Sequence, residues 1–258
     1  MVARLGSWFK KKVKNFLYTS GFLFTLLRES ILFIKRRQVG FRVLVMQILF
    51  TAVEALGIIS LISLSLGAVI IVQGITILPK FGQGNLIYTI LIIVITRELG
   101  PILTAFIIIA RSGTAIATEL GNMVVSHEIE AYLSVGINPF SYLLVPRFLG
   151  VIFSMMLLTV YFNLFGLFGS YVVTQFVKPI QFLEYFRSLL STIEVVDIIS
   201  SLIKSIVFGI IIGFIATYQG FQVQIASTEI PQIAIKAVGQ GFVLCILANA
   251  LITLIYYI

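Results

Sequence analysis

The chain has 258 residues, of which 59% are hydrophobic and 11% are charged, and its mean hydropathy is +1.11. A soluble domain of this length cannot bury so much apolar surface, so the composition excludes a globular soluble protein and indicates an integral membrane protein. Each membrane-spanning helix uses about 20 residues, which leaves room for about five spans and for no separate soluble domain.

Positive charge is concentrated near the N-terminus. The net charge is +8. The basic residues before the first long apolar run include Arg4, Lys10, Lys11, Lys12, Lys14, Lys35, Arg36, Arg37 and Arg42. This bias places the N-terminus on the cytosolic or stromal side. Because the cluster flanks membrane segments, we expect anionic lipid headgroups as its partner and no nucleic acid.

Residues 1–42 are interpreted as a basic N-terminal interfacial segment. Within it, the apolar stretch Phe16 to Ile34 is interrupted by Arg28 and Glu29, and no small-residue cleavage site follows. These features disfavour a signal peptide and a sixth span. We predict an amphipathic helix that lies in the inner headgroup layer.

Five apolar runs predict the spans of a membrane domain over residues 43–258. They are Val43–Leu78, Leu86–Ala110, Phe148–Phe176, Ile198–Tyr218 and Ala237–Ile258. The first has about 36 residues and would measure about 54 Å as a helix, against a hydrocarbon core of about 30 Å. We therefore divide it into a cytosolic-side approach, Val43–Leu56, and a span, Gly57–Leu78. The predicted fold is an all-α integral membrane protein with about five transmembrane helices.

The predicted orientation assigns each connection to one side of the membrane. With the N-terminus inside, residues 79–85 and 177–197 lie outside, residues 111–147 and 219–236 lie inside, and the C-terminus finishes outside.

The inner connection between the second and third spans carries a helix signal. Glu119 to Val135 is predicted as a helix, Gly136 suits a left-handed cap, and Pro139 prevents continuation. Such a helix either presents an amphipathic face to a soluble subunit or rests on the membrane surface, and sequence alone favours neither.

Arg97 and Glu98 are charged residues about midway along the second apolar run, just before Pro101. A charge at the bilayer centre costs about 2.5–3.5 kcal/mol on insertion scales, so these residues are candidates for a function. Adjacent residues on a helix point about 100° apart, and each therefore needs another partner. Either Arg97 snorkels while Glu98 bonds a neighbouring helix, or one or both face a partly wet cavity and contact a lipid headgroup.

Small residues mark positions where helices can approach closely. They are Gly57, Ser60, Ser63, Ser65 and Gly67 in the first span, Gly166, Gly169 and Ser170 in the third, and Gly209 and Gly213 in the fourth. The last two form a G-x-x-x-G motif, which by itself is weak support for a dimer contact.

No catalytic or metal site is predicted. His127 is the only histidine, HEIEA lacks the second histidine of a zinc site, and no P-loop motif occurs. Any ATP must therefore be bound by a partner chain. Two alternatives stay open: an intramembrane lipid-modifying enzyme that uses Glu119, His127 and Glu128 as acid and base, and an ion- or proton-conducting subunit that uses Arg97 and Glu98 as relay groups.

Several ordered motifs resemble the MlaE permease family of ABC transporters. They are RELGPILTAFIIIARSGTAIATELGNM from Arg97, EIEAYLSVGINP from Glu128, and VPRFLGVIFSMMLLTVYFNLFGLFGSYVV from Val145, with weaker echoes in TYQGF and STEIPQIAIKAV. The family includes bacterial lipid-asymmetry permeases, the plant trigalactosyldiacylglycerol permease and permeases encoded in algal plastid genomes. The resemblance runs from about Val43 over most of the chain.

The resemblance implies a homodimeric permease that moves phospholipid or a related polar lipid, with ABC-type ATPase subunits below it and an MCE-domain lipid-binding protein on the far side. It places Glu130, Ala131 and Gly136 in an EAA-type coupling loop, and we assign Glu119 and Glu128 to the same coupling segment. The chain departs from the importer pattern after Gly136, where Pro146 arrives early. No cofactor is expected on this chain, and ATP is expected on the ATPase.

We expect a multi-pass membrane protein located in the plastid (chloroplast) inner envelope, with the bacterial inner membrane as the alternative. No Arg- and Ser-rich transit peptide precedes the first membrane-active segment. The heavy use of Ile, Phe and Tyr is typical of an AT-rich genome and favours a plastid gene.

Overall fold

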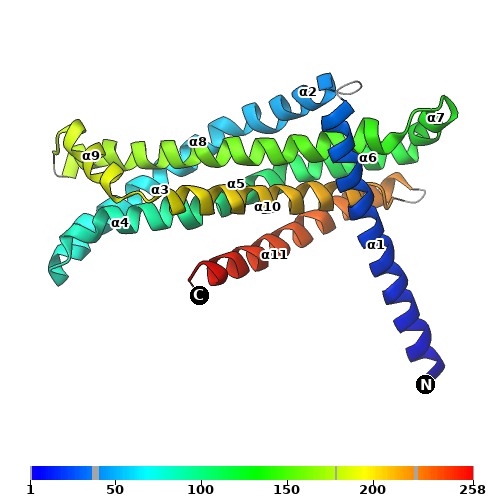
Figure 1. Cartoon of the computed structure of the whole chain (residues 1–258), viewed down its shortest axis with the longest axis horizontal. Coiled ribbons are helices and arrows are strands. Elements are labelled where there is room, and N and C mark those ends of the chain that lie inside the picture. The colour runs from blue at the N-terminus through cyan, green and yellow to red at the C-terminus, as the bar shows by residue number, and fades with distance from the viewer. Residues whose placement is uncertain (1, 37–40, 178, 224–225, 258) are drawn as a thin grey trace.

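The computed structural model describes residues 2–36, 41–177, 179–223 and 226–257, and within them it contains helices and no strands (Figure 1). Five helical stretches are long and apolar enough to cross a membrane: Phe41–Phe81, Ile87–Val125, Phe140–Val177, Val195–Gly220 and Ile230–Tyr256. The chain is therefore an all-α multi-pass membrane protein, as the sequence predicted.

The first two stretches are each built from several helical segments. The first contains α2 (Phe41–Ala52), η1 (Val53–Ala55), α3 (Leu56–Ile77) and η2 (Leu78–Phe81). The second contains α4 (Ile87–Ile92), the π-helical η4 (Ile93–Leu99), α5 (Gly100–Ile108), the π-helical η5 (Ile109–Gly113) and α6 (Thr114–Val125). A helix boundary lies at the predicted division of the first run, since η1 ends at Ala55 and α3 begins at Leu56.

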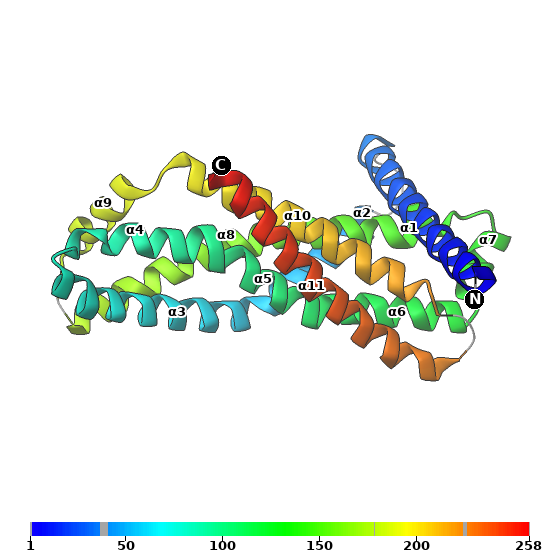
Figure 2. The ribbon, with the colours of Figure 1, turned by 90° about the horizontal axis from the view of Figure 1, so that it is seen from below.

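The remaining segments complete the bundle. They are α1 (Val2–Arg36), η3 (Gly84–Leu86), α7 (Glu128–Ser134), η6 (Phe140–Leu144), α8 (Val145–Val177), α9 (Phe182–Thr192), α10 (Val195–Gly220), η7 (Ser227–Glu229) and α11 (Ile230–Tyr257). The core forms around α8, which packs against α2, α3 and α10. By contrast, α11 crosses the outside of the bundle diagonally (Figure 2), and only 11% of its most apolar window is buried. One face of α11 is therefore left open.

Glycines allow α3 and α8 to approach at backbone distance. A Cβ on Gly67 would lie 2.0 Å from the carbonyl oxygen of Gly166, which no side chain permits. Gly209 and Gly213 face Ile152 and Phe148 of α8, so the G-x-x-x-G motif packs within the chain. The packing role predicted for Gly57 is wrong, because a Cβ there would meet no atom within 4 Å.

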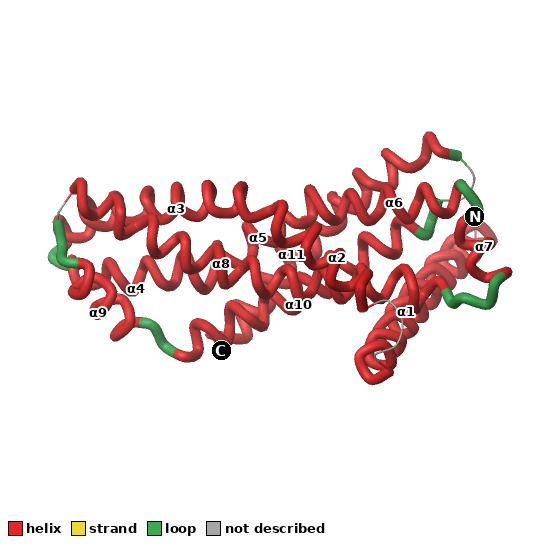
Figure 3. The backbone as a smooth tube through the Cα atoms, turned by 90° about the horizontal axis from the view of Figure 1, so that it is seen from above, coloured by secondary structure: helices red, strands yellow, loops and turns green. Residues whose placement is uncertain are grey.

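The N-terminal helix α1 is longer than predicted, with 35 residues, and it lies crosswise at one end of the bundle (Figure 3). Aromatic contacts attach it there, since the Phe22 ring lies 5.3 Å from that of Phe140. The Ser141 hydroxyl also donates a 2.8 Å hydrogen bond to Glu29. This crosswise placement suits a helix at the membrane surface. Arg37, one of the predicted basic residues, lies outside the described residues.

The opposite end is closed by α9, which lies between the third and fourth spans. Tyr185 is fully buried there, and its hydroxyl lies 2.7 Å from the Ser170 hydroxyl of α8. Burial raises the pKa of Tyr185 to about 12, despite the opposing effect of the Ser170 hydrogen bond. Leu183 and Leu190 are exposed on the other face of α9. The helix is thus amphipathic and docked by its aromatic side.

The prediction of one helix over Glu119–Val135 is wrong. The second span continues as α6 to Val125, His127 then adopts a left-handed backbone with φ 57°, and α7 begins at Glu128. Two β-branched residues, Val124 and Val125, followed by a serine weaken the helix at this point.

The predicted cap at Gly136 is confirmed. Gly136 has φ 77° and donates to the Leu133 carbonyl at 3.0 Å, while Ile137 donates to the Tyr132 carbonyl at 2.9 Å. These two bonds form a Schellman motif, which satisfies carbonyls that the end of α7 leaves without helical donors.

Candidate functional site

The π-helical segment η4 carries both Arg97 and Glu98. In a regular α-helix the Arg97 carbonyl would accept a hydrogen bond from the N–H of residue 101, which is a proline and has none. The Nζ of Lys204 donates to this carbonyl instead, at 3.0 Å. Pro101 thus leaves a backbone acceptor that a buried cation on α10 satisfies.

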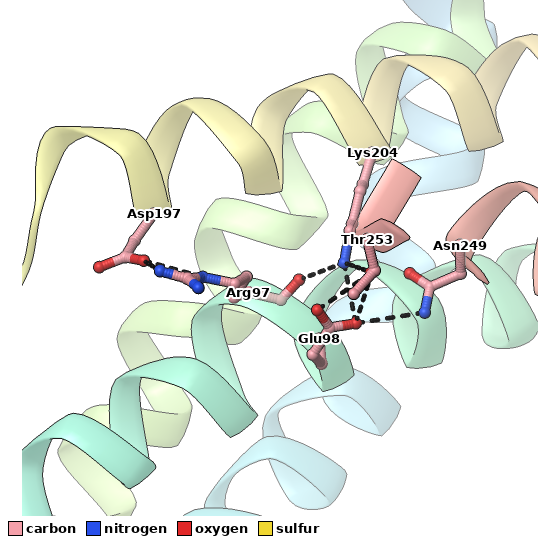
Figure 4. A network of polar contacts seen from close by, with 6 residues as sticks. All are labelled: Arg97, Glu98, Asp197, Lys204, Asn249 and Thr253. Carbon is pink, nitrogen blue, oxygen red and sulfur yellow. Dashed lines mark hydrogen bonds and ion pairs between the residues drawn. The ribbon is translucent and has the colours of Figure 1, made fainter. Parts of the chain in front are cut away.

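Arg97 pairs with Asp197 at the start of α10 (Figure 4). Its Nε lies 2.9 Å from Asp197 Oδ1, and its guanidinium lies 4.4 Å from the ring centroid of Tyr256 on α11. Asp197 also accepts a 3.1 Å bond from the backbone N–H of Glu194, as part of a capping box. Arg97 is 8% exposed and Asp197 is 3% exposed, so Arg97 does not snorkel to an interface.

Glu98 pairs with Lys204 of α10, with 2.8 Å between Oε2 and Nζ. Asn249 Nδ2 and Thr253 Oγ1 of α11 each donate to Glu98 at 3.2 Å. The Lys204 ammonium also donates to Thr253 Oγ1 at 2.9 Å, and its side chain is 1% exposed. Arg97 and Glu98 therefore find separate partners, as predicted.

These six residues, Arg97, Glu98, Asp197, Lys204, Asn249 and Thr253, are called the buried polar network (Figure 4). Arg97 is ten residues after Ile87, the first residue of α4, which corresponds to about 15 Å or half of a hydrocarbon core. The network has two cations and two anions and is neutral overall. Buried ion pairs contribute little net stability compared with apolar packing, so their presence inside apolar spans points to a function.

The sequence reasoning missed the partners on α10 and α11. Lys204 gave a usable signal, because it is the one charged residue in the run Ile198–Tyr218. Asp197 was assigned to an outer connection, and nothing local indicates its pairing with a residue 100 positions earlier. Asn249 and Thr253 are uncharged and stand out only once α11 is placed beside η4.

The predicted coupling residues fall into two groups. Glu128, Glu130 and Ala131 are exposed on α7, where Leu133 and Val135 add exposed apolar surface. Gly136 caps this helix. The short helix is held at the tip of the bundle by Ile129 and Tyr132, which pack against the core.

Glu119 lies apart from the rest of the predicted coupling residues, on α6. Its Oε1 lies 2.5 Å from Nη2 of Arg147. His127 Nδ1 lies 3.1 Å from Glu130 Oε2 and both side chains are exposed. The bonds that Glu119 and His127 make therefore do not join these residues, with Glu128, into the acid–base group of the enzyme alternative.

Comparison with known proteins finds similarity to membrane permeases over most of the chain. The model of the family described as Permease MlaE matches residues 44–255. A probable ABC transporter permease protein of Rickettsia prowazekii is 30% identical over 214 residues, which cover 83% of each chain. The intermembrane phospholipid transport system permease protein MlaE of Haemophilus influenzae is 25% identical over 84% of each chain.

A plant relative also matches. The chloroplastic protein TRIGALACTOSYLDIACYLGLYCEROL 1 of Arabidopsis thaliana is 29% identical over 192 residues, which cover 74% of this chain and 55% of that protein. The family match extends from α2 to α11 and includes every residue of the buried polar network. The chain therefore belongs to the MlaE permease family.

Proposed function

We propose that this chain is the membrane-spanning permease subunit of an ABC transporter that moves phospholipid or a related polar lipid. The observation that carries the proposal is the buried polar network, which holds four charges inside apolar spans. The printed names of the relatives add support, since one is an ABC transporter permease and another a phospholipid transport permease.

In this proposal Arg97 attracts the phosphate or another polar part of the headgroup, and Glu98 tunes the field around it. Three contacts to the network come from α11: the Tyr256 ring over Arg97, and the Asn249 and Thr253 bonds to Glu98. Because α11 is the least buried span within one copy of the chain, its movement together with the copy packed on its open face opens the network with little loss of packing inside the chain. The lipid headgroup then exchanges with the carboxylates as the partner of the cations.

The proposal includes partner subunits. An ABC-type ATPase, which binds the ATP, docks on α7 and its Gly136 cap, where carboxylates and apolar side chains are exposed together. Two copies of the chain associate through the open face of α11. An MCE-domain lipid-binding protein sits on the outer side, and the complex resides in a plastid inner envelope or a bacterial inner membrane.

Lipid transport in vesicles reconstituted with the ATPase tests this function. Arg97→Gln and Glu98→Gln preserve shape but remove charge-assisted bonds worth about 1.5–3 kcal/mol each, so we expect about tenfold or greater loss of transport. Basal ATP hydrolysis should persist. Lys80→Gln, on the exposed outer turn, is the matched control and should transport normally. Full transport by both single variants, or ion flux without lipid movement, would overturn the proposal.

A further inference from the structure

A charged cavity lies away from the buried polar network, between α2, α6 and the start of α8. Its volume is about 700 Å³, and we call it the inner cleft. Two ion pairs line it, Glu54 with Arg111 and Glu119 with Arg147. Among the residues that the structure describes, no other charged residue lines the cleft, so this described lining is neutral overall.

The inner cleft lies at the depth of lipid headgroups. Arg111 is 24 residues beyond Ile87, the first residue of the span, or about 36 Å along a helix, whereas a hydrocarbon core is about 30 Å thick. In the predicted orientation this level is the headgroup layer of the inner leaflet. Met46 and Phe50 of α2 form an apolar edge of the cleft and are 50% and 64% exposed, which suits contact with acyl chains.

The two arginines of the cleft are more buried than the two carboxylates, with Arg147 the more firmly held, and the carboxylates can turn outward. The Arg147 side chain is 6% exposed, and its Nη1 donates to the Leu143 carbonyl at 2.9 Å. Arg111 Nη1 donates to the Phe50 carbonyl at 3.4 Å. In contrast, the side chains of Glu54 and Glu119 are 49% and 52% exposed. A phosphodiester can therefore replace a carboxylate on an arginine, and the released carboxylate can accept a headgroup ammonium.

We propose that the inner cleft is a binding site for one zwitterionic phospholipid of the inner leaflet. The alternating cations and anions match a headgroup that carries both a phosphate and an ammonium, whereas a neutral lining gives no preference for a lipid of net negative charge. This site rests on the proposed lipid-transport function and adds to it a second lipid position, about 20 Å from the buried polar network along the span.

Photo-crosslinking in nanodiscs tests the site on the full chain without ATP. The probe is p-benzoylphenylalanine in place of Phe50, in bilayers of equal parts phosphatidylethanolamine, phosphatidylglycerol and digalactosyldiacylglycerol. We expect phosphatidylethanolamine to dominate the adducts found by mass spectrometry. Ala115→Trp, which fills the cleft between Arg111 and Glu119 on the same helical stretch, should lower that adduct at least fivefold, and so should Arg111→Gln.

Ala110→Trp is the matched control, because this exposed alanine of the same span does not line the cleft, and its adduct should be unchanged. Adducts in proportion to the lipid mixture, or an unchanged adduct in Ala115→Trp, would overturn the site. The adduct forms without ATP, so the crosslinking result does not depend on transport. A loss of transport in the vesicle assay would therefore not overturn the site.

Discussion

Lys204 is the one cation on the span α10, and three oxygen acceptors stabilise it there. They are the Arg97 carbonyl, the Glu98 carboxylate and the Thr253 hydroxyl. Its ammonium has three N–H groups, so each donor has an acceptor. Replacing one member of such a group leaves the others buried with unsatisfied charge, which costs more than the pair contributes when intact.

A double-mutant cycle on Glu98 and Lys204 checks this coupling. Lys204→Gln should lower the free energy of unfolding by about 3 kcal/mol, the lower end for a broken buried pair, because the Glu98 side chain is 27% exposed and partly solvated. Glu98→Gln with Lys204→Gln should cost at least about 1 kcal/mol less than the sum of the single variants. Chemical unfolding in detergent measures the cycle, with Lys80→Gln as a control expected within about 0.5 kcal/mol of the parent. Simple additivity would mean that the two charges are not coupled.

At the scale of elements, the sequence predicted where α7 ends but did not predict where it begins. Gly136 was predictable because a glycine followed by Pro139 is a local signal. The break at His127 was not predictable, because the helix-favouring pattern that begins at Glu119 continues through residue 127. A histidine with a left-handed backbone also has no distinctive sequence context. The result is a short helix that is separated from the long span and held by its cap.

Substitution at Gly136 tests whether the shape of this element matters for ATPase docking. Gly136→Val requires a β-branched residue at φ 77° and costs about 1–2 kcal/mol, which should unravel the end of α7 and reduce co-purification of the ATPase. Gly136→Asn should retain most of it, because asparagine tolerates the left-handed region. Gly57→Val is the matched control, because Gly57 has open space around it and no positive φ is recorded there. Equal ATPase recovery with valine at either position would remove α7 from the docking role.

The spans themselves were largely predictable, because a bilayer requires long apolar helices and these are recognised in the sequence as runs of apolar residues. What could not be predicted was the π-helical geometry of η4 and η5, since no residue pattern in ITREL or IARSG specifies it. The partners of Arg97 and Glu98 were also hidden, because they depend on how α10 and α11 pack against the second span. Sequence thus located one half of the network, and tertiary structure supplied the other.

At the scale of the whole molecule, the bundle is unevenly packed. In its most apolar stretch, the span that contains α8 is 72% buried and the span formed by α11 is 11% buried, although both spans are apolar. Exposed leucines at positions 247 and 251 lie one turn apart on the open face of α11. Because Asn249 and Thr253 of the same helix bond Glu98, a second copy packed on α11 would lie beside the buried polar network.

Cysteine crosslinking tests that arrangement in the membrane. Leu247→Cys or Leu251→Cys should give a disulfide-linked dimer under mild oxidation, because equivalent residues on a two-fold axis approach each other. Leu157→Cys on α8 is the matched control, since it is 58% exposed in a span but lies on a helix packed into the core, and it should remain monomeric. The native Cys245 is buried and should contribute no background. Equal crosslinking at Leu157 would indicate random collision, and its absence at both α11 positions would exclude this face as the dimer contact.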